Sequence, residues 1–181
     1  HGWTRNLNVE KKYQNIDKRF IFYNMGFNLR PTDVSAAIGL SQFERLKKFQ
    51  KQRDYNRKKI IDTLVSSKKW KNQFSFQKIN PLCNPSWFGL PIFINKNYIK
   101  NKIKFINFLE KKGIETRPII SGNFLNQPAI KKFRLNTKNK KCPNAQKVED
   151  CGFFIGLHTT RIKNSELNFL VDNLLKIEKF A

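Results

Sequence analysis

The sequence predicts an α/β fold in which a long helical stretch precedes alternating short strands and helices. No proline interrupts residues 32–66, where apolar side chains recur at spacings near three and four, as in a helix. The apolar segment at residues 86–94 is typical of a buried strand, and later segments alternate between strand and helix patterns. The 181 residues suffice for one domain, or for a small domain plus part of a larger one.

The helical stretch begins near Pro31, which suits the first helical position, and Asp33 complements the positive end of the helix. We expect either one long helix or two abutting ones. The recurring apolar side chains are Val34, Ala37, Ile38, Phe43, Leu46 and Phe49. The distal half is predicted to be largely solvated, because it carries Arg53, Arg57, Lys58 and Lys59.

The second half predicts shorter elements. Strands are expected at residues 74–77, 86–94, 115–119 and 153–156. Helices are expected at residues 100–112, where Gly113 stops the helix, at 128–133, at 143–151 and at 165–180. In the last helix the inward-facing side chains are predicted to be Leu167, Leu170, Val171, Leu174 and Leu175.

The charge balance is strongly basic: 36 Lys and Arg against 13 Asp and Glu give a formal net charge of +23. Such a balance is typical of proteins that bind nucleic acids or anionic surfaces. The cations are mostly lysines spread along the whole chain, a distribution that favours a solvated surface over a phosphate-binding track. We therefore expect no nucleic-acid partner, and keep a basic nucleic-acid-binding domain as an alternative.

Other composition features restrict the class of protein further. The longest apolar runs are too short to span a bilayer, and no signal peptide pattern is visible, so we expect a cytoplasmic protein without membrane insertion. The three cysteines have no CxxC spacing, which supports neither a zinc ribbon nor a disulfide framework. With only two histidines, His1 and His158, no metal cluster is expected.

The segment GFNLRPTDVSAAIGL at residues 26–40 carries a candidate binding motif. A glycine and an amide side chain just before a helix present neutral donors that a phosphate can approach closely. Arg30 adds a guanidinium fork suited to phosphate or pyrophosphate. The alternative is structural, with Asn28 closing a turn and Arg30 pairing with Asp33.

Four segments in one order together resemble a known family. They are GFNLRPTDVSAAIGLSQFERL, WFGLPIFI, KGIETRPIISGNF followed by QP, and PNA with FFIGLH. The chain resembles the C-terminal half of the DegT/DnrJ/EryC1/StrS sugar aminotransferase family, pyridoxal 5'-phosphate (PLP) enzymes of aspartate-aminotransferase fold. The third and fourth segments resemble most the branch of nucleotide-sugar 3-dehydratases, which act in lipopolysaccharide biosynthesis.

The resemblance implies a domain organisation and a set of site residues. Residues 1–52 would end the large PLP-binding domain and begin the long helix, and residues 53–181 would form the small α/β domain. Asn28 would reach the cofactor phosphate of a neighbouring subunit in a homodimer with shared active sites. Arg30 and Arg117 would contact the nucleotide-sugar substrate, as would Asn123 in the loop at residues 121–124. His158 is a further candidate, although a histidine after a buried strand is also typical of a structural role.

The resemblance also implies the chemistry, in which PLP or its pyridoxamine form acts as an electron sink. Transamination would take an amino group from glutamate, whereas 3-dehydration would expel the sugar's 3-hydroxyl, and the sequence leaves both open. The catalytic lysine or histidine is expected upstream of His1, so we expect a C-terminal part that is inactive alone. Residues 2–23 lack the clustered cysteines of iron-sulfur-dependent relatives, so no cluster is expected. An inactive or structural remnant of such an enzyme is the second alternative.

Overall fold

The computed structural model describes residues 26–27, 29, 31–120, 122–135 and 140–180. The chain divides into two compact units, His1–Arg45 and Leu46–Ala181. The predicted domain boundary near Arg53 falls inside the first helix of the second unit and stays a prediction.

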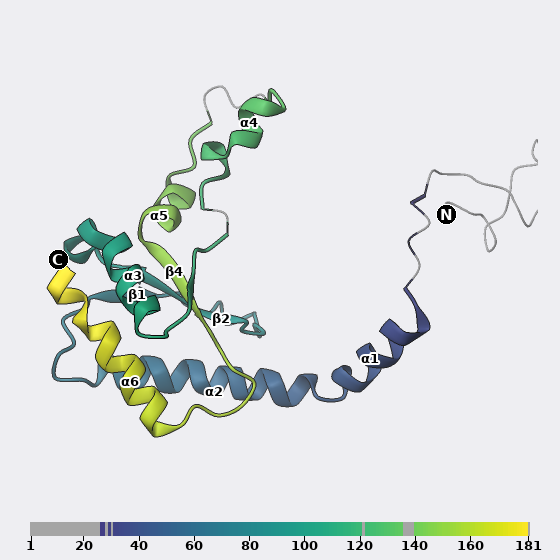
Figure 1. Ribbon diagram of the computed structural model, residues 1–181, viewed down its shortest axis with the longest axis horizontal. Coiled ribbons are helices and arrows are strands. Elements are labelled where there is room, and N and C mark those ends of the chain that lie inside the picture. The colour runs from purple at the N-terminus through teal and green to yellow at the C-terminus, as the bar shows by residue number, and fades with distance from the viewer. Residues whose placement is uncertain (1–25, 28, 30, 121, 136–139, 181) are drawn as a thin grey trace, which may run out of the picture. The chain divides into compact units, whose positions relative to one another are not determined.

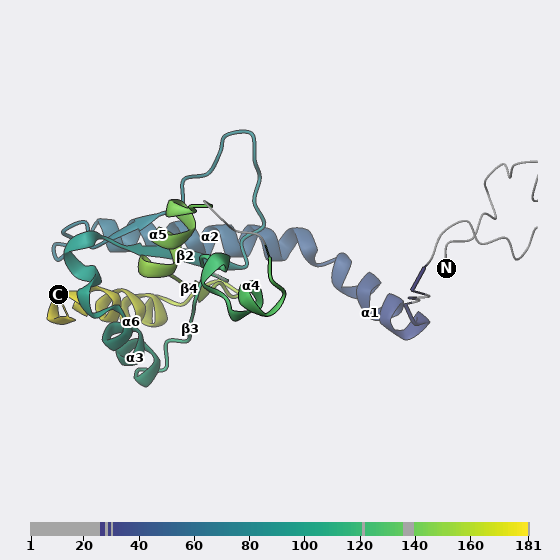
Figure 2. The same ribbon diagram turned by 90° about the horizontal axis from the view of Figure 1, so that it is seen from above.

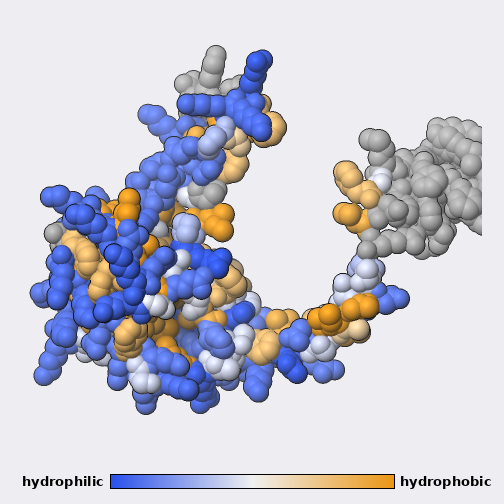
Figure 3. Space-filling model, viewed as in Figure 1, coloured by the Kyte–Doolittle hydropathy of each residue, from blue (hydrophilic) through white to orange (hydrophobic). Residues whose placement is uncertain are grey.

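In the first unit, helix α1 spans Asp33–Phe43. Thr32 is its N-cap, because the Thr32 hydroxyl accepts a hydrogen bond from the Ser35 amide at 3.2 Å. The prediction that Pro31 takes the first helical position was therefore wrong: Pro31 precedes the cap. None of the α1 residues is buried. Its surface shows apolar side chains in Figure 3, and the large exposed ones are Val34, Ile38, Leu40 and Phe43.

The second unit opens with helix α2, Leu46–Val65, so the predicted stretch consists of two helices and not one. Its buried residues are Asn56, Arg57, Ile60 and Leu64. The prediction that Arg57 is solvated was wrong, since only 8% of this residue is exposed. Its guanidinium lies 4.3 Å from the centre of the Trp87 ring and donates to the Gln77 carbonyl at 3.0 Å. Burial lowers the pKa of Arg57, opposed by the nearby Asp54.

Four antiparallel strands form the sheet in the order β1-β2-β4-β3. Their bounds are Phe74–Phe76 for β1, Gly89–Ile94 for β2, Thr116–Arg117 for β3 and Gly152–Gly156 for β4. All four predicted strands are present, although β2 begins three residues later and β3 is shorter than expected. Strand β4 is one of the two inner strands, because it pairs with β2 on one side and with β3 on the other.

The core lies on one face of this sheet. Alternate residues of β2 and β4 point into it, namely Leu90, Ile92, Ile94, Phe153 and Ile155. Phe105 is fully buried among aromatic rings, with ring centres 6.1 Å from Phe74, 6.3 Å from Phe153 and 5.7 Å from Phe180. Helices α2, α3 and α6, whose paths appear in Figures 1 and 2, also contribute buried side chains to this core, as does η5.

The helix predicted at residues 100–112 begins as a 3-10 turn, η3, over Lys96–Asn101 and continues as α3, Lys102–Lys111. Gly113 follows with a φ of +80°, which confirms the predicted glycine stop. The last predicted helix likewise consists of α6, Asn164–Leu174, and a 3-10 turn η5, Leu175–Phe180. Four of its five predicted inward-facing residues are buried, and Leu170 is half-buried.

The remaining elements lie between β3 and β4. They are a 3-10 turn η4 over Phe124–Asn126, α4 over Pro128–Lys132 and α5 over Pro143–Cys151. The bounds of α5 are those predicted. A Cβ on Gly152 would lie 2.5 Å from the Val148 carbonyl oxygen of α5 and 3.4 Å from the Phe93 ring, so α5 contacts the sheet on the face opposite the core.

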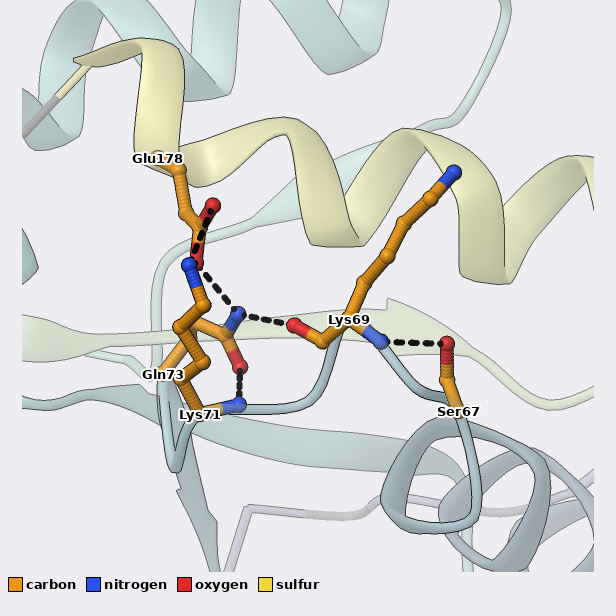
Figure 4. Close-up of polar contacts among 5 residues, drawn as sticks. All are labelled: Ser67, Lys69, Lys71, Gln73 and Glu178. Atoms are coloured by element: carbon orange, nitrogen blue, oxygen red, sulfur yellow. Dashed lines mark hydrogen bonds and ion pairs between the residues drawn. The ribbon is translucent and has the colours of Figure 1, made fainter.

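A buried amide joins the C-terminal turn to the segment before β1 (Figure 4). Gln73 is fully buried, and its Oε1 accepts from the Lys71 amide at 2.9 Å. Its Nε2 donates to the Lys69 carbonyl at 2.8 Å and to the Glu178 carboxylate at 3.2 Å. Glu178 also pairs with the Lys71 ammonium at 3.1 Å. The amide therefore fixes η5 against the start of the sheet.

We predict that Gln73→Ala lowers the free energy of unfolding by about 2 kcal/mol, because it removes three hydrogen bonds made by a buried amide. Lys69→Ala is the matched control, since the Lys69 side chain points away from the cluster in Figure 4 and only its carbonyl takes part. Urea unfolding of the two variants measures the difference. Equal stability would contradict the role given to the amide.

Candidate functional site

Two of the predicted site residues, Asn28 and Arg30, lie outside the described residues. Their roles at a cofactor phosphate and at the substrate stay predictions. The other three, Arg117, Asn123 and His158, all belong to the second unit.

Arg117 lies on β3, opposite Phe154 of β4, on the side of the sheet away from the core. Its guanidinium is exposed and ion-paired with Glu115: the Nη2 and Nε donors lie 2.7 Å and 3.0 Å from the same Oε1. Both side chains are exposed, so solvent screens this pair and it contributes little stability. The guanidinium is therefore able to exchange the carboxylate for another anion.

Asn123 follows β3 and is only 8% exposed. Its Oδ1 accepts from the Leu125 amide at 3.1 Å, and its Nδ2 donates to Gln146 Oε1 at 3.0 Å. Its backbone amide donates to Glu149 Oε2 at 2.7 Å. The structure thus places Asn123 inside a hydrogen-bond network against α5.

His158 lies in the segment that follows β4, and its side chain is exposed. Its Nδ1 is 2.8 Å from the Thr160 hydroxyl. Asn56 of α2 holds the backbone of this segment: the Asn56 Nδ2 donates to the His158 and Thr160 carbonyls at 3.1 and 2.7 Å, and its Oδ1 accepts from the Ile162 amide at 2.9 Å. Both ends of this buried amide are satisfied, so it defines the path of the chain beside His158.

A cavity of about 810 Å³ opens beside this segment. Its lining combines apolar side chains such as Phe88, Ile155 and Phe169 with polar ones. The polar lining residues include Arg53, Glu115, His158, Arg161 and Glu166. A cavity of this size with a few convergent polar groups is of the kind that binds small molecules.

A smaller cavity, of about 210 Å³, lies toward the opposite end of β4 and includes Arg117 and Lys102 in its lining. The strand register explains the separation. Thr116 pairs with Ile155 in the antiparallel ladder, so the residue before β3 lies near the end of β4, whereas Arg117 and the residues after it lie toward the start of β4. The structure therefore brings Glu115 and His158 to one cavity, Arg117 to another, and Asn123 to neither.

Burial alters the ionisation of Lys102, which lines the small cavity, and of Cys151, which interacts with Lys102. Burial lowers the pKa of Lys102, whose Nζ donates to the Glu149 carbonyl at 2.7 Å. The charges of Cys151, Asp150 and Glu149 act in the opposite direction. Burial likewise raises the pKa of the Cys151 thiol, against the effect of Lys102. The Cys151 thiol is buried, whereas the Cys83 and Cys142 thiols are exposed. All three cysteines are free.

Sequence reasoning missed Asn56 and Glu149. Asn56 had a detectable signal, since it precedes Ile60 and Leu64 at four-residue spacing and so falls on the buried stripe of α2. Glu149 had no such signal, because its partners lie 23 and 26 residues away across an irregular segment.

Among the described residues, no group of three or more His, Cys, Asp or Glu side chains is placed to hold a metal ion. No helix in this part of the chain has the length and apolar character needed to cross a membrane.

Residues 1–173 match the DegT/DnrJ/EryC1/StrS aminotransferase family. The chain belongs to this family. It is 30% identical over 176 residues to a GDP-4-keto-6-deoxy-D-mannose 3-dehydratase of Escherichia coli O55:H7, covering 94% of this chain and 44% of that protein. The chain thus spans less than half the length of this relative.

Solved structures agree with the family assignment. The E. coli GDP-4-keto-6-deoxy-D-mannose-3-dehydratase with bound hydrated PLP superimposes with a TM-score of 0.76 at 28% identity, over 96% of this chain and 44% of that chain. The Helicobacter pylori aminotransferase PseC superimposes with a TM-score of 0.69 over 87% of this chain and 40% of that chain, but at 18% identity it shows the fold alone. The predicted fold, the C-terminal part of a fold type I PLP enzyme, is confirmed.

We predict that Asn56→Ala accelerates hydrogen exchange at the Ile162 amide and lowers the free energy of unfolding by about 2 kcal/mol, because three backbone groups lose their partner. Asn168→Ala, on the exposed side of α6, is the control that removes an amide without such contacts. Hydrogen exchange, measured by mass spectrometry or NMR, distinguishes the two variants. An unchanged Ile162 amide would show that another group holds this segment.

We also predict that alkylation of the folded protein modifies Cys83 and Cys142 quickly and Cys151 only on unfolding. The thiolate is the reactive form, and burial both covers the Cys151 thiol and raises its pKa. Mass spectrometry after timed alkylation checks this order. Equal rates at the three thiols would contradict the burial of Cys151, and a Cys83→Ser, Cys142→Ser variant isolates its slow reaction.

Proposed function

We propose that this chain is the C-terminal part of a PLP-dependent enzyme that acts on a 4-keto-6-deoxy nucleotide sugar in lipopolysaccharide or other polysaccharide biosynthesis. The observation that carries the proposal is the family match over residues 1–173, together with 30% identity to a GDP-4-keto-6-deoxy-D-mannose 3-dehydratase. One solved relative, 30% identical with a TM-score of 0.75 over 96% of this chain and 45% of that chain, contains GDP-perosamine. The proposed location is the cytoplasm.

Between the two reactions, 3-dehydration is the better supported. The matched 3-dehydratases are 27–30% identical to this chain, whereas the aminotransferase PseC is 18% identical. A 3-dehydratase has also been solved with a trapped PLP-glutamate adduct, so glutamate is a candidate amino donor for either reaction. Transamination remains the alternative reaction, and the assay described below separates the two by their products.

The cofactor, when bound, supplies an electron sink for the sugar substrate. In our proposal the chain contributes assisting groups: Asn28 contacts the cofactor phosphate of the neighbouring subunit in a homodimer, and Arg30 binds substrate phosphate. Arg117 is suited to bind the pyrophosphate, because its guanidinium is exposed and held only by a screened pair with Glu115. His158 contributes from the segment after β4, and Asn123 contributes through the shape of the loop after β3. The proposal includes no iron-sulfur cluster and no metal.

The described residues leave the cofactor phosphate contact untested, since Asn28 is not among them. We predict that Asn28→Ala in the complete protein lowers PLP retention several-fold, because a neutral donor to the phosphate is lost. The absorbance of bound PLP after gel filtration measures retention. Asn107→Ala, on the exposed side of α3, is the control.

The outcomes separate the alternatives. Unchanged occupancy in Asn28→Ala would show that Asn28 does not hold the cofactor. Complete protein that retains no PLP or pyridoxamine phosphate would favour the inactive remnant, and a DNA mobility shift with a steep salt dependence would favour the basic nucleic-acid-binding domain. With a 4-keto nucleotide sugar and glutamate, a 3-deoxy product indicates dehydration and a 4-amino product indicates transamination.

A further inference from the structure

Residues 122–126 are held against α5 by hydrogen bonds, most of them to the Glu149 carboxylate. Gly122 adopts a φ of +67°, Asn123 is almost fully buried, and η4 follows at once. The segment contributes few apolar side chains to the core: Phe124 is 53% exposed and Asn126 is exposed. Polar contacts with α5 therefore determine its conformation; we name residues 122–126 the β3–α4 loop.

Glu149 makes the largest share of these contacts. Its Oε2 accepts from the Asn123 amide at 2.7 Å, and its two oxygens each lie 3.1 Å from the Asn126 Nδ2. Hydrogen bonds to a charged acceptor are stronger than neutral ones. The carboxylate thus binds the backbone at one end of the loop and a side chain at the other.

Gly122 and Glu149 fit each other closely. A Cβ at position 122 would lie 2.8 Å from Glu149 Cβ and 2.9 Å from its Cγ and Oε2, closer than nonbonded atoms approach. The positive φ is a second reason for glycine at this position. The carboxylate reaches the Asn123 amide because the residue before it has no side chain.

A second amide completes the network. Gln146, one turn earlier on α5, accepts from the Nδ2 groups of Asn123 and Asn126 at 3.0 Å each, and donates to Asp150 at 2.8 Å. The Glu149 backbone carbonyl accepts from Lys102 of α3. The loop is therefore tied through α5 to an element that packs on the core.

Residues 118–121 connect the loop to Arg117 at the end of β3. The loop itself exposes the side chain of Phe124. The Asn123 side chain is committed to Gln146 and to the Leu125 amide, so it sets the loop's shape. Arg117 and Phe124 both have exposed side chains and are available to a ligand.

We propose that Glu149 is a positioning residue of the substrate site: it holds the β3–α4 loop so that Phe124, together with Arg117, is presented to the nucleotide sugar. This inference rests on the proposed function. Glu149 acts through the loop and takes no part in proton transfer. Its loss would weaken substrate binding and leave the chemical step nearly unchanged.

The test compares Glu149→Ala and Glu149→Gln with Asp172→Ala in the complete protein. Asp172→Ala removes one exposed carboxylate from α6 and so controls for net charge. In Glu149→Ala we expect exchange of the Asn123 amide to accelerate about tenfold, since a buried donor loses its acceptor. We expect KM for the nucleotide sugar to rise about tenfold while kcat changes less than about twofold. Glu149→Gln keeps one acceptor oxygen, so we expect its Asn123 exchange rate and its KM to lie between those of the wild type and of Glu149→Ala.

The outcomes distinguish this inference from the proposed function. Faster exchange at Asn123 with an unchanged KM would overturn the positioning role, because loop order would not matter for substrate. Exchange that stays at the wild-type rate in both variants would also overturn it. If Glu149→Ala does not fold, Glu149→Gln carries the same comparison. A wild-type protein that neither binds nor turns over the nucleotide sugar would refute the proposed function, whatever the exchange data show.

Discussion

The antiparallel pairing of β4 with β2 on one side and with β3 on the other is the interaction on which the rest of the second unit depends. It aligns Phe153 and Ile155 with the core and leaves Phe154 opposite Arg117 on the other face. It also explains why the two cavities are separate, since antiparallel neighbours bring the start of one strand beside the end of the next. A one-residue slip of this register would turn the core side chains outward.

The sequence predicted the elements best where proline or glycine marks their ends. Pro143 and Gly152 delimit α5, and Gly113 ends α3 through a left-handed conformation that other residues rarely adopt. The patterns did not distinguish α-helix from 3-10 turns at η3 and η5, because residues three apart share a face in both kinds of helix. The burial of Arg57 was also not predictable, because the ring that covers it belongs to Trp87, thirty residues further along the chain.

The candidate site was also predictable only in part, because many of its contacts join residues far apart in the sequence. Arg117, Asn123 and His158 were found from local segments, and each lies at or beyond the end of a strand, where loops carry function. What local segments could not predict is how these residues are held. Asn56 contacts carbonyls more than 100 residues away, and Glu149 contacts a loop 23 to 26 residues earlier. Such contacts exist only after the sheet has formed.

These two holding residues share a physical design. Each is a polar side chain on a helix that contacts the sheet or its core, and each satisfies backbone groups of a loop that lacks ladder partners. Helices α5 and α2 therefore hold the loops after β3 and β4 in shape. Because a buried backbone group without a partner is costly, each loop is confined to one conformation as long as its helix stays packed. The loops that would face a substrate are thus held by the packed helices, although they add few side chains to the core.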